Sequence, residues 1–150
     1  MAITSVYFDA ALVAKFYVNE PGRDGVRALA REMGRVVTSG ITVAEVSAAF
    51  HRKLREGSVD HDVFDALMGQ FQQDLEGGLW CLVGPSEELF MEVHAFFATL
   101  DSGVFVRSLD ALHLITARLE GFSRIYSNDR HLLGACVHAN LEGVDPVAGS

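Results

Sequence analysis

The 150-residue sequence has few cysteines and prolines and no long uncharged apolar run. Its two cysteines, Cys81 and Cys136, are too few for a disulfide framework or a zinc cluster and are typical of a reducing compartment. No uncharged run approaches the ~20 apolar residues that a membrane span needs, and the first residues carry no positively charged signal-peptide region. We therefore expect a soluble, cytoplasmic protein without membrane contact.

Disorder and repeats are also excluded, because 49% of the residues are hydrophobic, 21% are charged and only three are proline. A chain of this length can bury an ordinary core without disulfides or a structural metal. Residues 1–150 are therefore expected to form a single domain.

Lysine and arginine are absent between Arg55 and Arg107, where ten acidic residues lie. The remaining sequence holds all 12 basic residues against the other 10 of the 20 acidic ones. The overall charge of −8 thus averages an acidic stretch with a mildly basic remainder, and it does not exclude a nucleic-acid partner.

Short apolar strands alternate with amphipathic helices along the chain. Strands are predicted at 6–8, 35–39, 79–83 and 124–127, with a last edge strand at 141–146. Helical periodicity is found at 12–17, 26–34, 43–57, 63–77, 89–100, 109–121 and 132–136. This alternation predicts an α/β three-layer sandwich, with a central, mostly parallel sheet flanked by helices.

Four acidic residues lie at strand ends or helix starts: Asp9, Glu45, Asp110 and Asp129. Each has a structural explanation by itself. Asp9 and Asp129 can cap the helices that follow them, and Thr42 and Glu45 have the spacing of a capping box. Asp110 follows a predicted Ser108 cap and suits the first turn of its helix.

Their shared position favours a functional interpretation. In a parallel sheet, all four carboxylates would lie at one edge and point into one cleft. Four carboxylates repel one another unless cations or protons neutralise them, and Mg²⁺ or Mn²⁺ suits an all-oxygen site. The chemistry expected from this arrangement is metal-assisted phosphodiester hydrolysis.

The segments around these acids carry a family resemblance. Phe8-Asp9, Thr42-x-Ala44-Glu45-Val46, Ser108-Leu-Asp110-Ala-Leu-His113 and Ser127-Asn-Asp129-Arg130 resemble, in order, the four acidic motifs of PIN-domain ribonucleases, specifically VapC-type toxins of toxin–antitoxin pairs. The resemblance runs from Val6 to about Leu133, and the motif around Asp110 is its most specific part.

The resemblance implies a five-stranded, mainly parallel PIN-like sheet and an Mg²⁺- or Mn²⁺-dependent endoribonuclease that cleaves single-stranded RNA. By match to the motifs, the metal-binding acids are Asp9, Glu45, Asp110 and Asp129, and Ser127 matches a hydroxyl position two residues before the last acid. The resemblance also implies a homodimer and a small antitoxin protein whose tail blocks the cleft. Ala10 and Ala11 stand where relatives usually carry Ser or Thr, so a hydroxyl that would steady the first carboxylate or a bound water is missing here.

The residues that could contact phosphate are Lys15, Arg52, Lys53, Arg107, Ser127 and Arg130, although any one of the basic side chains could simply be a solvated surface charge. A packing role is favoured over catalysis for His113. Trp80 is expected in the core, and the apolar stretch 90–97 in the core or at a dimer face.

Other functions fit less well. A phospho-acceptor receiver domain needs a lysine late in the chain, but the only lysines are Lys15 and Lys53. A haloacid-dehalogenase-type phosphatase would have a second acid two positions after Asp9, where Ala11 stands. The stronger alternative is a catalytically weak or inactive PIN-like module that binds RNA or protein.

Overall fold

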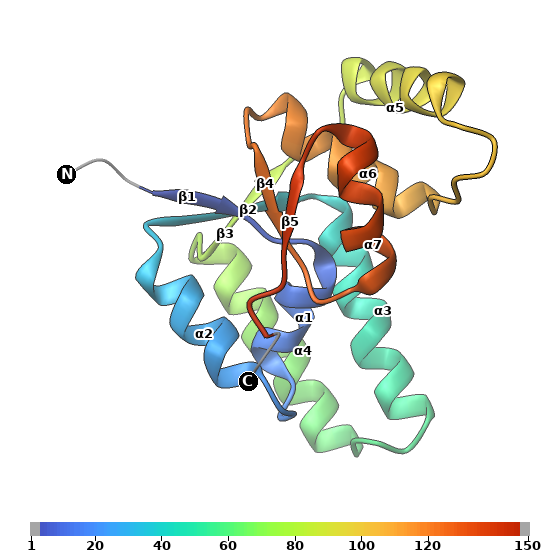
Figure 1. Ribbon diagram of the computed structural model, residues 1–150. Coiled ribbons are helices and arrows are strands. Elements are labelled where there is room, and N and C mark those ends of the chain that lie inside the picture. Colours follow the sequence, from blue (N-terminus) through green and yellow to red (C-terminus); the bar gives the residue numbers. More distant parts are fainter. Residues whose placement is uncertain (1–3, 148–150) are drawn as a thin grey trace.

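Five parallel strands form the centre of the molecule in the computed structural model, which describes residues 4–147 (Figure 1). They are β1 (Ser5–Tyr7), β2 (Arg35–Ser39), β3 (Trp80–Val83), β4 (Arg124–Tyr126) and β5 (Glu142–Val144). The strands β1, β2 and β3 pair in parallel, as do β4 and β5. The two parts meet at one parallel bridge between Phe8 and Tyr126, so the spatial order is β3-β2-β1-β4-β5.

The predicted α/β sandwich is confirmed, with the difference that its sheet is divided into three-stranded and two-stranded parts. The division lies where β1 and β4 run into the loops that carry Asp9 and Asp129. Beside the bridge, the amide of Asp9 donates to the carbonyl of Tyr126 at 3.2 Å, and the Ser127 hydroxyl donates to the Asp9 carboxylate. The ends of the expected domain 1–150 lie outside the described residues.

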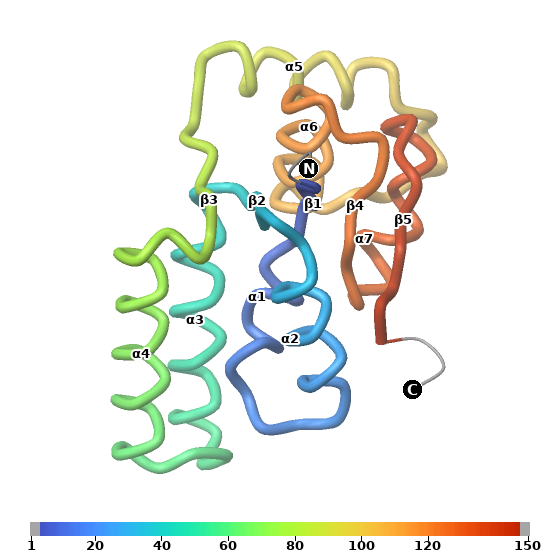
Figure 2. The backbone as a smooth tube through the Cα atoms, turned by 90° about the vertical axis from the view of Figure 1, so that its left-hand side faces the viewer, coloured from blue at the N-terminus to red at the C-terminus, as the bar shows by residue number. Residues whose placement is uncertain are grey.

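Helices cover both faces of the sheet (Figure 2). One layer holds α1 (Ala10–Tyr17), α2 (Arg23–Glu32), α3 (Ile41–Arg55) and α4 (His61–Glu76). The other holds α5 (Glu87–Thr99), α6 (Ser108–Leu119), α7 (Arg130–Ala135) and the 3₁₀ helix η1 (Cys136–Ala139). Each segment predicted as helical corresponds to one of these helices.

Two hydrophobic clusters pack between the sheet and its helical layers. Successive side chains of β1 point to opposite faces, so Phe8 joins the cluster under α1–α4 and Tyr7 joins the cluster under α5–α7. Trp80 is buried in the first cluster and donates its indole N–H to the Tyr17 hydroxyl at 2.7 Å, which confirms its predicted core position.

The helix α5 lies at the outer edge of the molecule and packs against α6 (Figure 1). Only Leu89 and Phe96 of its apolar residues are fully buried. Phe90, Met91 and Phe97 are exposed. The stretch 90–97 therefore contributes less to the core than its composition suggests, and it leaves an apolar face in solvent.

Two predicted helix caps are wrong. The helix α3 starts at Ile41, so Thr42 lies inside it, and the Thr42 hydroxyl bonds the Thr38 hydroxyl of β2 at 2.7 Å. A hydrogen bond to the hydroxyl four residues earlier thus replaces the expected capping box, and the Glu45 side chain does not reach back to the Thr42 amide. The helix α6 begins at Ser108 itself, with Arg107 in the cap position and no capping side chain.

Within residues 4–147, no helix is both long enough and apolar enough to cross a membrane.

Candidate active site

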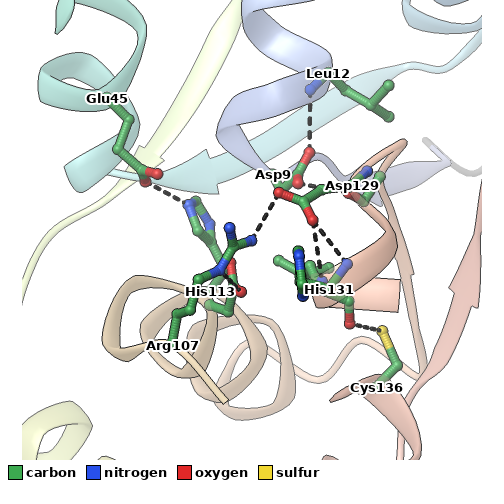
Figure 3. A network of polar contacts seen from close by, with 11 residues as sticks. Asp9, Leu12, Glu45, Arg107, His113, Asp129, His131 and Cys136 are labelled. Atoms are coloured by element: carbon green, nitrogen blue, oxygen red, sulfur yellow. Dashed lines mark hydrogen bonds and ion pairs between the residues drawn. The ribbon is translucent and has the colours of Figure 1, made fainter. Parts of the chain in front are cut away.

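All four predicted acidic residues line one pocket of about 300 Å³ at the carboxyl end of the sheet. Asp9 and Asp129 come from the junctions β1–α1 and β4–α7, whereas Asp110 lies in the first turn of α6 and Glu45 is the fifth residue of α3. Figure 3 shows Asp9, Glu45 and Asp129 around Arg107. The other lining residues are Ala10, Ala11, Ser108, Leu109 and His113.

Asp9 is the most deeply buried of the four carboxylates, with 3% of its surface exposed. Its Oδ1 accepts from the backbone N–H of Leu12 at 3.0 Å, so Asp9 does cap α1. Its Oδ2 accepts from the Ser127 hydroxyl at 2.6 Å. Burial raises the pKa of Asp9 to about 6, although these hydrogen bonds and His113 favour the ionised form. The same Asp9 carboxylate therefore caps α1 and lines the pocket.

Ser127 lies behind the pocket rather than in it. The residue is fully buried, donates to Asp9 and accepts from the backbone N–H of Asp129 at 2.9 Å. Expected as a substrate contact, it instead joins the two acid-bearing junctions. Its hydroxyl supplies the support for Asp9 that Ala10 and Ala11 lack.

Arg107 bridges two of the carboxylates. Its Nε donates to Oδ2 of Asp110 and its Nη2 donates to Oδ2 of Asp129, each at 2.7 Å. These bonds raise the pKa of Arg107. Partial burial works to raise the pKa of Asp129, but the bond from Arg107 and the backbone bonds from His131 and Leu132 bring it below its ordinary value. The guanidinium therefore supplies positive charge between acids that would otherwise repel.

Glu45 is held by a residue for which the sequence favoured a packing role. Its Oε1 lies 2.7 Å from Nε2 of His113, and Nδ1 of His113 lies 2.8 Å from the Tyr7 hydroxyl. His113 is indeed buried, with 1% exposed, yet it lines the pocket. Sequence reasoning missed Tyr7, which ends β1 and lies in the hydrophobic cluster on the opposite side of the sheet from Phe8.

The pocket suits a hard divalent cation in the chemistry of its donors, which are all carboxylate oxygens. Within residues 4–147, no three His, Cys, Asp or Glu side chains are grouped closely enough to form a ready metal cluster. The positive charge between Asp110 and Asp129 comes instead from Arg107. The carboxylate oxygens are thus suitable ligands for a divalent cation. Such a cation would share the carboxylates of Asp110 and Asp129 with Arg107.

A second pocket, of about 370 Å³, adjoins the first and shares Ala10, Ala11, Glu45 and Asp129 with it. Lys15, Arg52 and Lys53 line this second pocket, together with further small side chains. The amino groups of both lysines lie 3.6 Å from carboxylate oxygens of Glu20.

The predicted basic residues are therefore divided between several places. Lys15, Arg52 and Lys53 gather in the second pocket, and Arg107 lies in the first. Arg130 opens α7 and lines neither pocket.

The comparisons with known proteins agree with this fold. A family model described as PIN domain matches residues 6–136. No curated protein matches the chain. Among solved structures, FitAcB from Neisseria gonorrhoeae has a TM-score of 0.73 at 17% identity, covering 95% of this chain and 99% of the other.

Two further solved structures are similar. VapC20 from Mycobacterium tuberculosis, described as a Sarcin-Ricin loop cleaving toxin, has a TM-score of 0.65 at 14% identity, covering 87% of this chain and 94% of its own. A toxin–antitoxin complex from Klebsiella pneumoniae gives 0.66 at 13% identity, with 94% and 97% covered. At these identities the likeness concerns the fold.

Proposed function

Since this chain belongs to the PIN domain family, we propose that it is an Mg²⁺- or Mn²⁺-dependent endoribonuclease that cleaves single-stranded RNA, and that residues 1–150 are one PIN domain. The observation that carries the proposal is the convergence of four acids, from four separate segments, on one pocket. Such a cluster needs positive charge, and a phosphodiester substrate would bring more negative charge to it.

In this mechanism, the cation would be held by Asp9, Glu45, Asp110 and Asp129. When bound, the cation supplies Lewis-acid stabilisation of the phosphate and an activated water. Ser127 and the amide of Leu12 fix the Asp9 carboxylate, so one wall of the site is rigid before substrate arrives. Arg107 is close enough to the acids to exchange a carboxylate for a phosphate oxygen.

The adjoining pocket supports RNA as the substrate. Lys15, Arg52 and Lys53 would contact phosphates beside the scissile one, and the alanine side chains leave room for ribose and base. The similar VapC20 structure is described as an RNA-loop cleaving toxin, which favours the same substrate class here.

We further infer that the protein is the toxin of a toxin–antitoxin pair, acts in the cytoplasm and binds a small cognate antitoxin. The structural likeness to a toxin–antitoxin complex supports this partner. A homodimer is supported by the exposed apolar residues of α5, Phe90, Met91 and Phe97, because exposed apolar patches commonly mark interaction sites.

The test is cleavage of end-labelled single-stranded RNA by the purified chain in Mn²⁺ or Mg²⁺, with and without EDTA. Asp9→Asn and Asp110→Asn should each reduce cleavage by about 100-fold. Asp62→Asn, on the exposed surface of α4, is the matched control and should cleave normally. Cleavage that persists in EDTA and in Asp9→Asn would contradict the proposal.

One observation favours the alternative of a binding module without turnover. Arg107 already satisfies Asp110 and Asp129, so the pocket is partly neutral without a metal. Calorimetric titration with Mn²⁺, followed by labelled RNA, separates the two functions: uptake of both without cleavage indicates a binding module.

A further inference from the structure

We propose that His113, braced by Tyr7, is a positioning residue that holds the Glu45 carboxylate at the pocket for the cation. The inference rests on the proposed function, because it assigns a task within the same site. It concerns side chains from three separate elements: Tyr7 on β1, His113 on α6 and Glu45 on α3.

Glu45 needs such support more than Asp9 and Asp129 do. Asp9 and Asp129 each receive backbone N–H groups in addition to a side-chain donor. Glu45 has a longer side chain, 27% exposed, and among the described residues its one hydrogen bond is to His113. Without that bond, the carboxylate would sample several rotamers, and ordering it would oppose cation binding.

The direction of the bond follows from the groups involved. An ionised carboxylate only accepts hydrogen bonds, so the proton between Glu45 and His113 belongs to Nε2. Burial raises the pKa of Tyr7 well above its ordinary value, so its hydroxyl keeps its proton and can donate to Nδ1 of His113. Tyr7 thereby favours the tautomer in which Nε2 donates to Glu45.

The two supporting residues are rigid. Tyr7 is fully buried and His113 is 1% exposed, and their rings meet edge to face with centroids 5.9 Å apart. Only Oε1 of Glu45 is used by this pair, and within residues 4–147 Oε2 accepts no hydrogen bond. The buried His113 ring thus restrains the Glu45 carboxylate through Oε1, while Oε2 of Glu45 remains available to the pocket.

The first experiment measures Mn²⁺ affinity of the full chain by calorimetry at neutral pH. His113→Leu keeps the bulk but loses the donor, and it should weaken Mn²⁺ binding by about tenfold or more. His113→Gln can place an amide N–H near the Nε2 position and should recover most of the affinity. Tyr7→Phe should show a smaller loss. His51→Leu, an exposed histidine on the same helix as Glu45, is the control and should bind as the wild type does.

The second experiment needs no metal, and it reads the hydrogen bond directly in long-range ¹H–¹⁵N spectra of the histidine rings. The wild type should show a protonated Nε2 on His113, and Glu45→Ala should shift this signal. An unprotonated Nε2, or a signal unaffected by Glu45→Ala, overturns the proposal even if variants at His113 fail to fold.

The Mn²⁺ affinities and the histidine spectra distinguish failure of the positioning role from failure of the proposed function. If wild-type protein binds no Mn²⁺, the metal-dependent function fails and with it the task assigned to Glu45. If the wild type binds Mn²⁺ and a folded His113→Leu variant binds it equally well, the positioning role is wrong while the proposed function stands.

Discussion

The hydroxyl of Ser127 donates to Oδ2 of Asp9 across 2.6 Å, although the two residues lie 118 positions apart in the chain. The bond joins the end of β1 to the end of β4, where the two parts of the sheet meet at a single bridge. The bond therefore links the two parts of the sheet and also fixes a candidate metal ligand.

Replacing Ser127 with alanine should lower the free energy of unfolding by about 1–3 kcal/mol at pH 7, because it leaves a buried carboxylate oxygen without its donor. Urea denaturation followed by circular dichroism measures the change. Ser102→Ala, at an exposed turn, should leave stability unaltered. Equal midpoints for the two variants would show that Ser127 contributes nothing to stability.

Asp9→Asn should stabilise the protein near neutral pH. The folded-state pKa of about 6 lies above the ordinary 3.8, so the folded state holds the proton more tightly and stability falls as pH rises from about 4 to about 6. This difference in the pKa of Asp9 corresponds to a loss of about 3 kcal/mol in the free energy of unfolding above pH 6. Asparagine keeps an oxygen for the Leu12 amide and carries no charge.

The measurement for Asp9→Asn is the difference in unfolding free energy between variant and wild type across pH 4 to 8. The difference should be small near pH 4, grow through pH 6 and level off above it. A difference that is constant with pH would mean that the Asp9 carboxyl titrates alike in the folded and unfolded chains.

Arg107→Gln should tighten Mn²⁺ binding several-fold, because a cation no longer competes with the guanidinium for Asp110 and Asp129. Calorimetry on the metal-free chain measures this change. Arg118→Gln removes a similar charge from α6, where the ion pair with Glu92 is 3.6 Å long, and should have no effect. Weaker Mn²⁺ binding in Arg107→Gln would show that Arg107 organises the acids instead of competing for them.

Lys15→Ala and Arg52→Ala should each weaken binding of single-stranded RNA and reduce its salt dependence, because both side chains line the pocket beside the acids. Each lost phosphate contact lowers the slope of log affinity against log salt by about 0.7. Fluorescence anisotropy in an Asp9→Asn background measures binding without turnover. Arg118→Ala is the control, and an equal loss in that variant would point to general charge attraction.

Much of the fold could be predicted because its signals are local. Period-two and helical apolar patterns depend on near neighbours, so the alternation of strands and helices and the burial of Trp80 were correct. The caps at Thr42 and Ser108 were wrong. The Thr42 hydroxyl bonds Thr38 of the preceding strand, and such a partner does not appear in the spacing of a capping box.

The sequence by itself determined that Asp9 and Asp129 follow strands and that Glu45 and Asp110 lie near the starts of helices, which in a parallel sheet directs all four to one edge. Only the tertiary structure decided their partners. Arg107 joins two of the acids, Ser127 holds a third from behind, and His113 holds the fourth. The physical reason is range: hydrogen bonds form over about 3 Å, and apart from the local pair Arg107–Asp110, these partners are brought that close only when strands and helices distant in sequence pack together.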